Sequence, residues 1–329
     1  MEIIKDYKAL TPIQEIDDPM FRYVKRDDLF QPFDELPFSG GKIRQAMCLV
    51  NNNIEHIKND CDNNVFSCTS VTSPQGAIIS RICNEHDIKC SIFVGGSVFP
   101  DTLVKSNLMM TAYEYGAMIN CDARVAFEVA VHAYATQYAQ AHGMKFFDVG
   151  FGINLESSPQ ALIESTAYQV QNIPDNIGTI IVPSGSCIIL SGIILGCRMF
   201  NKNVRRIVCV QIAGYDRSDT INRILSQYGI IDTTGMYEIE LSHDYAYARL
   251  LKKYTIDNGN ILLDPLYESK AYDYCAKHMN INPNEDNLFW IVGNSTYIRE
   301  HKVADDVVAR YLEENKDYHK DFNRNFKHS

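Results

Sequence analysis

A lysine that directly follows two glycines is the first residue of this chain that could do chemistry. Lys42 ends the motif Ser-Gly-Gly-Lys, and an apolar pattern of helical spacing begins behind it. The glycines permit a tight turn and a close approach of the backbone. A lysine at a helix start lies near the positive end of the helix dipole, which favours the neutral amine. A neutral amine can form a Schiff base, whereas the alternative is a surface lysine after a turn.

A second segment, residues 67–77, is crowded with hydroxyl groups between a predicted strand and a predicted helix. Its side chains Ser70, Thr72 and Ser73 could cap the helix or take part in binding a substrate carboxylate. The free N–H groups at the start of that helix would add an anion site.

Two further loops carry polar groups of the same kind. The segment around Ser184, Gly185 and Ser186 joins a buried strand to a helix, and its N–H and hydroxyl donors suit a phosphate group. Tyr267 and Glu268 follow an Asp-Pro stop and stand at a predicted helix start. A carboxylate at that place can simply complement the helix dipole, so each motif alone has a structural explanation.

Short apolar runs and longer helical patterns alternate along the chain, which predicts an α/β fold with open parallel sheets. In such sheets ligands bind at the carboxyl ends of the strands, where all four loops fall. The predicted strands are residues 21–25, 64–70, 89–96, 117–121, 145–150, 178–183, 205–214, 236–242 and 287–294. The predicted helices are residues 43–58, 75–86, 102–115, 124–142, 159–172, 187–200, 217–228, 243–254, 268–279 and 296–314.

Composition narrows the possible partners. The 329 residues carry a formal net charge of −10, which argues against tight binding to nucleic-acid backbones. The ten cysteines form no CxxC pair, so we predict reduced, buried thiols and no metal site. The start of the chain does not read as a signal peptide, and no apolar run approaches the ~18–20 residues of a membrane span. We therefore expect a cytoplasmic protein.

The order of these motifs resembles the fold type II, tryptophan-synthase-β-like pyridoxal-phosphate enzymes. Within that class the chain looks most like the aminocyclopropane-carboxylate deaminase and D-cysteine desulfhydrase family. The most specific motifs are VKRDDLF at 24–30 and LLDPLYESKA at 262–271, and the resemblance spans about residues 23–295. It implies two open parallel-sheet, three-layer domains and a homodimer. The domains would be a large cofactor-binding one, 1–45 with 166–329, and a small one, 46–165.

The resemblance also implies a role for each candidate residue. Lys42 would hold pyridoxal 5'-phosphate as an internal aldimine and later move a proton, with Tyr267 and Ser70 as catalytic partners. The other cofactor-binding residues would be Ser184, Gly185, Ser186 and Glu268, the last at the pyridine nitrogen. The substrate-binding residues would be Ser70, Thr72 and Ser73.

The chain departs from the family pattern in three of these loops. The asparagine before the lysine is missing, and Cys187, Ile188 and Ile189 replace residues that supply phosphate donors. Residues 70–72 read Ser-Val-Thr, without the family's amide donor, which leaves a less polar carboxylate site. We therefore expect substrate recognition to differ from that of the family.

Three functions agree with these observations. The leading one is a pyridoxal-phosphate enzyme of lyase or deaminase type that acts at the α-carbon of an amino acid or related amine. One alternative is a non-catalytic relative that kept the fold as a binding or scaffold protein. Another is an enzyme of the same class that acts on an amino acid attached to a nucleobase. A nucleotide-binding α/β protein is a weaker interpretation, because neither GxGxxG nor a Walker A motif is present.

Overall fold

The computed structural model describes residues 2–36, 38–95, 100–121, 128–156, 158–212, 216–242, 245 and 249–316. The chain divides into two compact units, each of two segments. Unit 1 is Met1–Asn53 with Gly152–Thr296, and unit 2 is Ile54–Phe151 with Tyr297–Ser329. Helix α1 (Gly41–Asn52) packs against α7 (Pro159–Ser165), and both lie in unit 1. The sequence places its domain boundaries instead at 45/46 and 165/166, and the assignment of cofactor binding to one domain stays a prediction.

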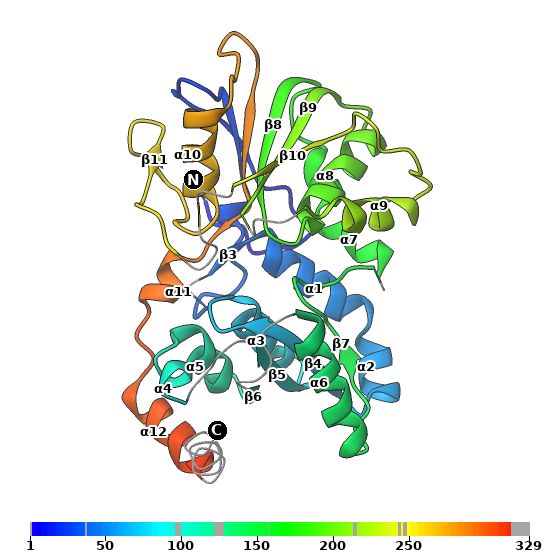
Figure 1. Cartoon of the computed structure of the whole chain (residues 1–329), viewed down its shortest axis with the longest axis vertical. Coiled ribbons are helices and arrows are strands. Elements are labelled where there is room, and N and C mark those ends of the chain that lie inside the picture. The colour runs from blue at the N-terminus through cyan, green and yellow to red at the C-terminus, as the bar shows by residue number, and fades with distance from the viewer. Residues whose placement is uncertain are drawn as a thin grey trace. The chain divides into compact units, whose positions relative to one another are not determined.

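Unit 1 is built on a six-stranded sheet. Its order is β1 (Ile13–Glu15), β2 (Tyr23–Arg26), β13 (Leu288–Ile291), β8 (Asn176–Ser184), β9 (Asn203–Gln211) and β10 (Glu238–Leu241). Only β1 runs antiparallel to its neighbour. Figure 1 shows α10 (Glu268–His278) and α8 (Ile188–Met199) on opposite sides of this sheet, and both pack on β8 and β9. The strands are apolar on both parities because helices cover both faces.

Unit 2 contains a parallel four-stranded sheet in the order β6 (Met118–Cys121), β5 (Lys89–Gly95), β4 (Asn64–Ser70) and β7 (Phe147–Asp148). Phe66 and Phe93 pack against α6 (Glu128–Ala141). Thr69 and Ile92, which have the opposite parity, lie against Gly76 of α3 (Gln75–Glu85). Since strand side chains alternate between faces, the two helices cover opposite faces. The predicted α/β fold with open parallel sheets in three layers is confirmed.

The remaining elements are short. They are η1 (Asp27–Leu29), β3 (Ser39–Gly40), α2 (Ile54–Asp60), α4 (Pro100–Val104), α5 (Asn107–Glu114), η2 (Ala167–Val170), α9 (Ser218–Ser226), β11 (Thr255–Ile256), β12 (Ile261–Leu262), β14 (Gly293–Asn294), α11 (Thr296–Glu300) and α12 (Asp305–Glu314). Each predicted strand range overlaps a strand of the structure. Four predicted helices, 43–58, 102–115, 159–172 and 296–314, are each divided into two shorter ones.

The predicted helix at 243–254 is wrong where the structure describes it. Residues 243–244 and 246–248 lie outside the described part, and the rest of the range is not helical. The backbone bonds to a distant segment instead: Leu251 N donates to Pro265 O at 2.9 Å, and Leu263 N donates to Tyr254 O at 2.9 Å. These long-range bonds replace the i→i−4 bonds that a helix would need.

The structure also bears on the predictions about cysteines, metal binding and membrane helices. All ten cysteines are buried and free. Among the described residues, no group of three or more His, Cys, Asp or Glu side chains is arranged to hold a metal ion. A search of the same residues finds no helix with the length and apolar character to cross a bilayer.

Candidate active site

The turn before Lys42 is fixed by a tight backbone pairing. β3 pairs antiparallel with β14, and Gly40 lies opposite Gly293. Gly40 has φ +126°, and a Cβ there would come within 2.4 Å of both Gly293 Cα and Val292 O. Only glycine fits this position. Gly41 N then donates to Val292 O at 2.9 Å, so Lys42 enters the first turn of α1 directly beside residues 292–293.

The amine of Lys42 has an unusual environment. The side chain is only partly exposed, and it forms no hydrogen bond or ion pair with any residue that the structure describes. Burial lowers the pKa of Lys42 from its ordinary 10.5 to about 8. Roughly a quarter of such an amine is neutral at pH 7.5, against about one in a thousand for an ordinary lysine. The lysine is therefore poised to react as a nucleophile or a base.

Glu268 binds the same backbone segment through its carboxylate. Its Oε1 accepts hydrogen bonds from the N–H groups of Val292 at 2.9 Å and Gly293 at 3.1 Å. Its Oε2 is buried and has no partner among the described residues. Burial, and next the charge of Asp264, hold the pKa of Glu268 well above its usual range. Such an unsatisfied carboxyl oxygen calls for a hydrogen-bond partner that the described chain does not supply.

Asp264 is a further candidate residue that the sequence reasoning missed. Its Oδ1 accepts from Leu266 N at 2.7 Å and Tyr267 N at 3.1 Å. Its Oδ2 accepts from Ser295 N at 2.7 Å and Ser295 Oγ at 2.6 Å. Asp264 thus joins the start of α10 to the end of β14. The only signal in the sequence is an aspartate just before a turn and a helix, a common capping position.

The Ser-Gly-Ser loop lies against Tyr267. A Cβ on Gly185 would stand 3.3 Å from Tyr267 Oη, so a larger residue there would press against the ring. Ser184 Oγ accepts from Cys187 N at 2.9 Å, and Gln211 Nε2 donates to Gly185 O at 2.7 Å. The loop is therefore held in shape by its own side chains.

The start of α8 leaves backbone donors available. No hydrogen bond within the described residues takes up the N–H groups of Ile188, Ile189 and Leu190. Free N–H groups at a helix start bind anions such as phosphate. The isoleucines at 188 and 189 remove side-chain donors, as the sequence predicted, but they leave these backbone donors in place. Ile189 also lies 3.6 Å from the position of a Cβ on Gly41, which joins this loop to the lysine turn.

Gly152 gives the first prediction. It has φ +71°, and a Cβ there would lie 2.6 Å from Ser186 Cβ. Gly152→Ala should lower the free energy of unfolding by about 1–3 kcal/mol and shift Ser186, weakening the binding of pyridoxal phosphate about tenfold. Urea unfolding and equilibrium titration measure the two effects. Gly229→Ala is the matched control, because Gly229 has φ +75° but no atom within 4 Å of its Cβ position. Equal losses in both variants would contradict the role of the contact.

The three predicted hydroxyls of unit 2 lie in one turn at the carboxyl end of β4. Ser70 Oγ and Thr72 Oγ1 are 3.2 Å apart, and Ser73 Oγ accepts from Gln75 N at 3.3 Å. Arg299 Nη2 donates to Thr72 O at 3.0 Å. The turn is ordered by bonds within unit 2 and keeps its hydroxyls partly exposed. That these residues bind substrate stays a prediction.

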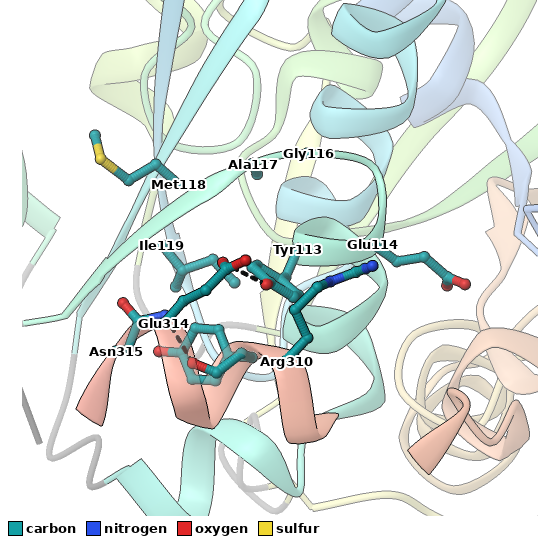
Figure 2. Close-up of a pocket in the computed structure, with 10 residues that line it drawn as sticks. Tyr113, Glu114, Gly116, Ala117, Met118, Ile119, Arg310, Glu314 and Asn315 are labelled. Carbon is teal, nitrogen blue, oxygen red and sulfur yellow. Dashed lines mark hydrogen bonds between the residues drawn. The ribbon is translucent and has the colours of Figure 1, made fainter. Parts of the chain in front are cut away.

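Unit 2 also holds a pocket of about 520 Å³ at one end of α5, beside β6 and α12 (Figure 2). Tyr113 Oη donates to Glu314 Oε2 at 2.6 Å across it, and the guanidinium of Arg310 lies 5.5 Å from the Tyr113 ring. These groups satisfy one another. None of the predicted site residues lines this pocket.

Comparisons with known proteins agree on one fold. No protein-family profile matches the chain. An O-seryl-dTMP PLP-dependent decarboxylase of Salmonella phage ViI is 24% identical to it, over 86% of this chain and 80% of that protein. The crystal structure of an ACC deaminase homologue matches with a TM-score of 0.66 at 18% identity, covering 94% of this chain and 95% of that one. An O-acetylserine-dependent cystathionine β-synthase from Helicobacter pylori matches with a TM-score of 0.58 at 14% identity, covering 90% and 98%.

The chain has the fold of the fold type II pyridoxal-phosphate enzymes. This result confirms the resemblance drawn from the sequence motifs. The described residues of unit 1 also fit the cofactor chemically. The orphaned Glu268 Oε2 matches a protonated pyridine nitrogen, and the free N–H groups at the start of α8 match a phosphate. The amine of Lys42, with its lowered pKa, matches an aldehyde.

Proposed function

We propose that this chain is a pyridoxal-phosphate-dependent enzyme of lyase or deaminase type, which acts at the α-carbon of an amino acid or related amine. The observation that carries the proposal is the shared backbone segment 292–293. It accepts a hydrogen bond from the turn of Lys42 and donates two to Glu268, whose second oxygen has no described partner. A reactive amine and an unsatisfied buried carboxyl are thus tied to one segment of unit 1.

Each residue has a task that follows from its environment. When bound, pyridoxal phosphate supplies an electron sink for charge that develops at the α-carbon of a substrate. Glu268 Oε2 would accept the N–H of the cofactor ring, and the N–H groups at 188–190 would bind its phosphate. Burial makes an ionised Glu268 costly unless a positive partner faces it, so the site favours a protonated ring nitrogen.

Lys42 would hold the cofactor covalently and then act as the base or acid at the substrate α-carbon. With a pKa of about 8, its Nζ can both take up and release a proton near neutral pH. We propose Tyr267, which lies against Gly185, as a second group at the cofactor. In unit 2, the hydroxyls of Ser70, Thr72 and Ser73 would bind the carboxylate of the substrate.

Cofactor binding is the direct test. Purified protein incubated with pyridoxal phosphate should show a visible absorption band shifted to longer wavelength than that of the free cofactor. Borohydride should fix the cofactor covalently, and peptide mass spectrometry should find the added mass on Lys42. An unshifted spectrum together with an unmodified Lys42 peptide would contradict the proposal and favour a non-catalytic binding or scaffold protein.

A modified nucleotide is a second candidate substrate. The observation in its favour is the similarity to the O-seryl-dTMP decarboxylase, which extends over 86% of this chain. The loss of an amide donor at 70–72 agrees with a substrate bulkier than a free amino acid. In this case the α-carbon would belong to a seryl group attached through oxygen to a thymidine monophosphate.

The two substrate classes are separated by product analysis. The loaded enzyme is incubated with a panel of free α-amino acids and, in parallel, with serine linked through oxygen to thymidine monophosphate. Release of ammonia from the free amino acids supports the first candidate, and release of carbon dioxide from the nucleotide supports the second.

We further propose that the protein is a cytoplasmic homodimer and that it has no nucleic-acid partner. Light scattering of the purified protein measures its mass in solution, which tests the dimer.

A further inference from the structure

The charged motif at 25–28, Lys-Arg-Asp-Asp, has no task in the function proposed above. Its four side chains divide into two groups. Arg26 and Asp28 pair with each other at 2.8 Å and keep 11% and 9% of their side chains exposed. Lys25 and Asp27 are 0% and 2% exposed. Two ionisable side chains buried in the core of unit 1 need a physical reason, because each costs free energy to desolvate in its charged form.

Asp27 uses both carboxylate oxygens. Oδ1 accepts from Thr11 Oγ1 at 2.6 Å and from Arg44 Nη1 at 3.2 Å. Oδ2 accepts from Trp290 Nε1 at 2.9 Å. The same Oδ2 lies 3.2 Å from the position of a Cβ on Gly41, so the carboxylate touches the turn that precedes Lys42. Asp27 therefore connects β13, which carries Trp290, to the first turn of α1.

Arg44 forms the buried ion pair with Asp27, although burying its guanidinium costs free energy. Its side chain is fully buried, and its guanidinium lies 4.4 Å from the Phe30 ring. Nη1 reaches Asp27 and, at 3.5 Å, Ser165 O, whereas Nε and Nη2 have no partner among the described residues. Buried ion pairs are weak contributors to stability, and unsatisfied nitrogens make this one weaker. We therefore attribute this ion pair to the backbone that it holds in place, and not to the stability that it adds.

We propose that Asp27 is a positioning residue for Lys42, which fixes the first turn of α1 through Arg44 and Gly41 and fixes β13 through Trp290. The proposal rests on the proposed function only in giving Lys42 the reactive role. Trp290 lies two residues before Val292, which accepts from Gly41 N and donates to Glu268 Oε1. The segment 290–293 thus positions both Lys42 and Glu268, and Asp27 holds the end of this segment at Trp290.

The test compares Asp27→Asn with Asp28→Asn, the same change one residue along. Trace labelling with acetic anhydride across pH, read by mass spectrometry, gives the pKa and reactivity of Lys42 without any cofactor. A loosened turn exposes the amine, so we expect Asp27→Asn to raise the pKa of Lys42 from about 8 towards 10.5. The lost negative charge alone would lower this pKa. A rise therefore reports the movement of the turn. Asp28→Asn should leave the value unchanged.

Two more variants separate positioning from stability. Asp27→Asn with Arg44→Met removes both members of the buried ion pair, and should recover much of the thermal stability that Asp27→Asn loses. Trp290→Phe keeps the ion pair, and removes the indole N–H together with part of the ring. Both should still raise the pKa of Lys42 and slow its covalent loading by pyridoxal phosphate about tenfold or more, since small misplacements of a reacting group are costly.

These experiments distinguish a failure of the positioning role of Asp27 from a failure of the proposed function. A wild-type pKa and loading rate of Lys42 in the double variant and in Trp290→Phe would overturn the positioning role. Recovery of stability without recovery of the pKa would support it. If wild-type protein takes up no cofactor on Lys42, the proposed function fails, yet anhydride labelling still decides whether Asp27 holds the lysine.

Discussion

The Lys42→Ala variant is expected to bind no pyridoxal phosphate covalently and to lose at least about 10³-fold in turnover. The reason is the position of this lysine. Its backbone is held at residues 292–293 by Gly41 N, and burial lowers the pKa of its amine to about 8. Glu268, bonded to the same segment, has a buried oxygen with no partner among the described residues. Borohydride fixation, followed by peptide mass spectrometry, and steady-state assays measure the two losses.

The same variant should fold normally. Lys42 makes no hydrogen bond or ion pair with a described residue, so its removal breaks no polar contact among them. Its folded pKa of about 8 lies below the ordinary 10.5, so the unfolded chain binds more protons between these values. Wild-type stability therefore gains from Lys42 as the pH rises from about 8 to about 10.5, and the variant should lack this gain. Lys58→Ala, in the exposed face of α2, is the control. Turnover by Lys42→Ala at the wild-type rate would disprove the role.

The sequence predicted the turn at Lys42 but not its partner. Two glycines before a lysine indicate a tight approach of the backbone, and the structure gives the cause in the contact between Gly40 and Gly293. That contact joins residues more than two hundred positions apart in the chain, and local spacing carries no information on such pairings. For the same reason the orphaned oxygen of Glu268 could not be foreseen, since its other oxygen is bonded to residues 292–293.

Long-range bonds also explain the one helix that was wrong. Residues 243–254 have an amphipathic spacing, yet Leu251 and Tyr254 bond to the backbone at 263–265. Propensity is a weak guide where another segment offers better partners. The parallel strands were easier to predict, because covering helices make both of their faces apolar. The Ser-Gly-Ser loop and the start of α8 could be predicted only in part. The loss of side-chain donors is visible in the sequence, but the free backbone N–H groups are not.

Glu268→Gln should keep cofactor binding on Lys42 and lose about 10²- to 10³-fold in turnover. The amide oxygen of glutamine can still accept from the N–H groups of Val292 and Gly293, so the segment 292–293 stays in place. An NH₂ group would then replace Oε2 and face the cofactor ring as a donor. It would keep the ring nitrogen unprotonated, which makes the cofactor a weaker electron sink. Turnover at the wild-type rate would contradict the assignment of Glu268.

The stability of the cofactor-free variant gives an independent measurement of the same buried oxygen. Burial and Asp264 raise the folded pKa of Glu268 well above its usual 4.5. The folded chain therefore binds the proton more tightly, and wild-type stability falls as the pH rises from about 4.5 through that raised pKa. Glutamine does not titrate, so urea unfolding of Glu268→Gln should show a flatter pH profile and a gain near neutral pH. Glu55→Gln, an exposed site in α2, should keep the wild-type slope. With cofactor bound the gain should reverse, because the glutamate then has a positive partner and the glutamine does not.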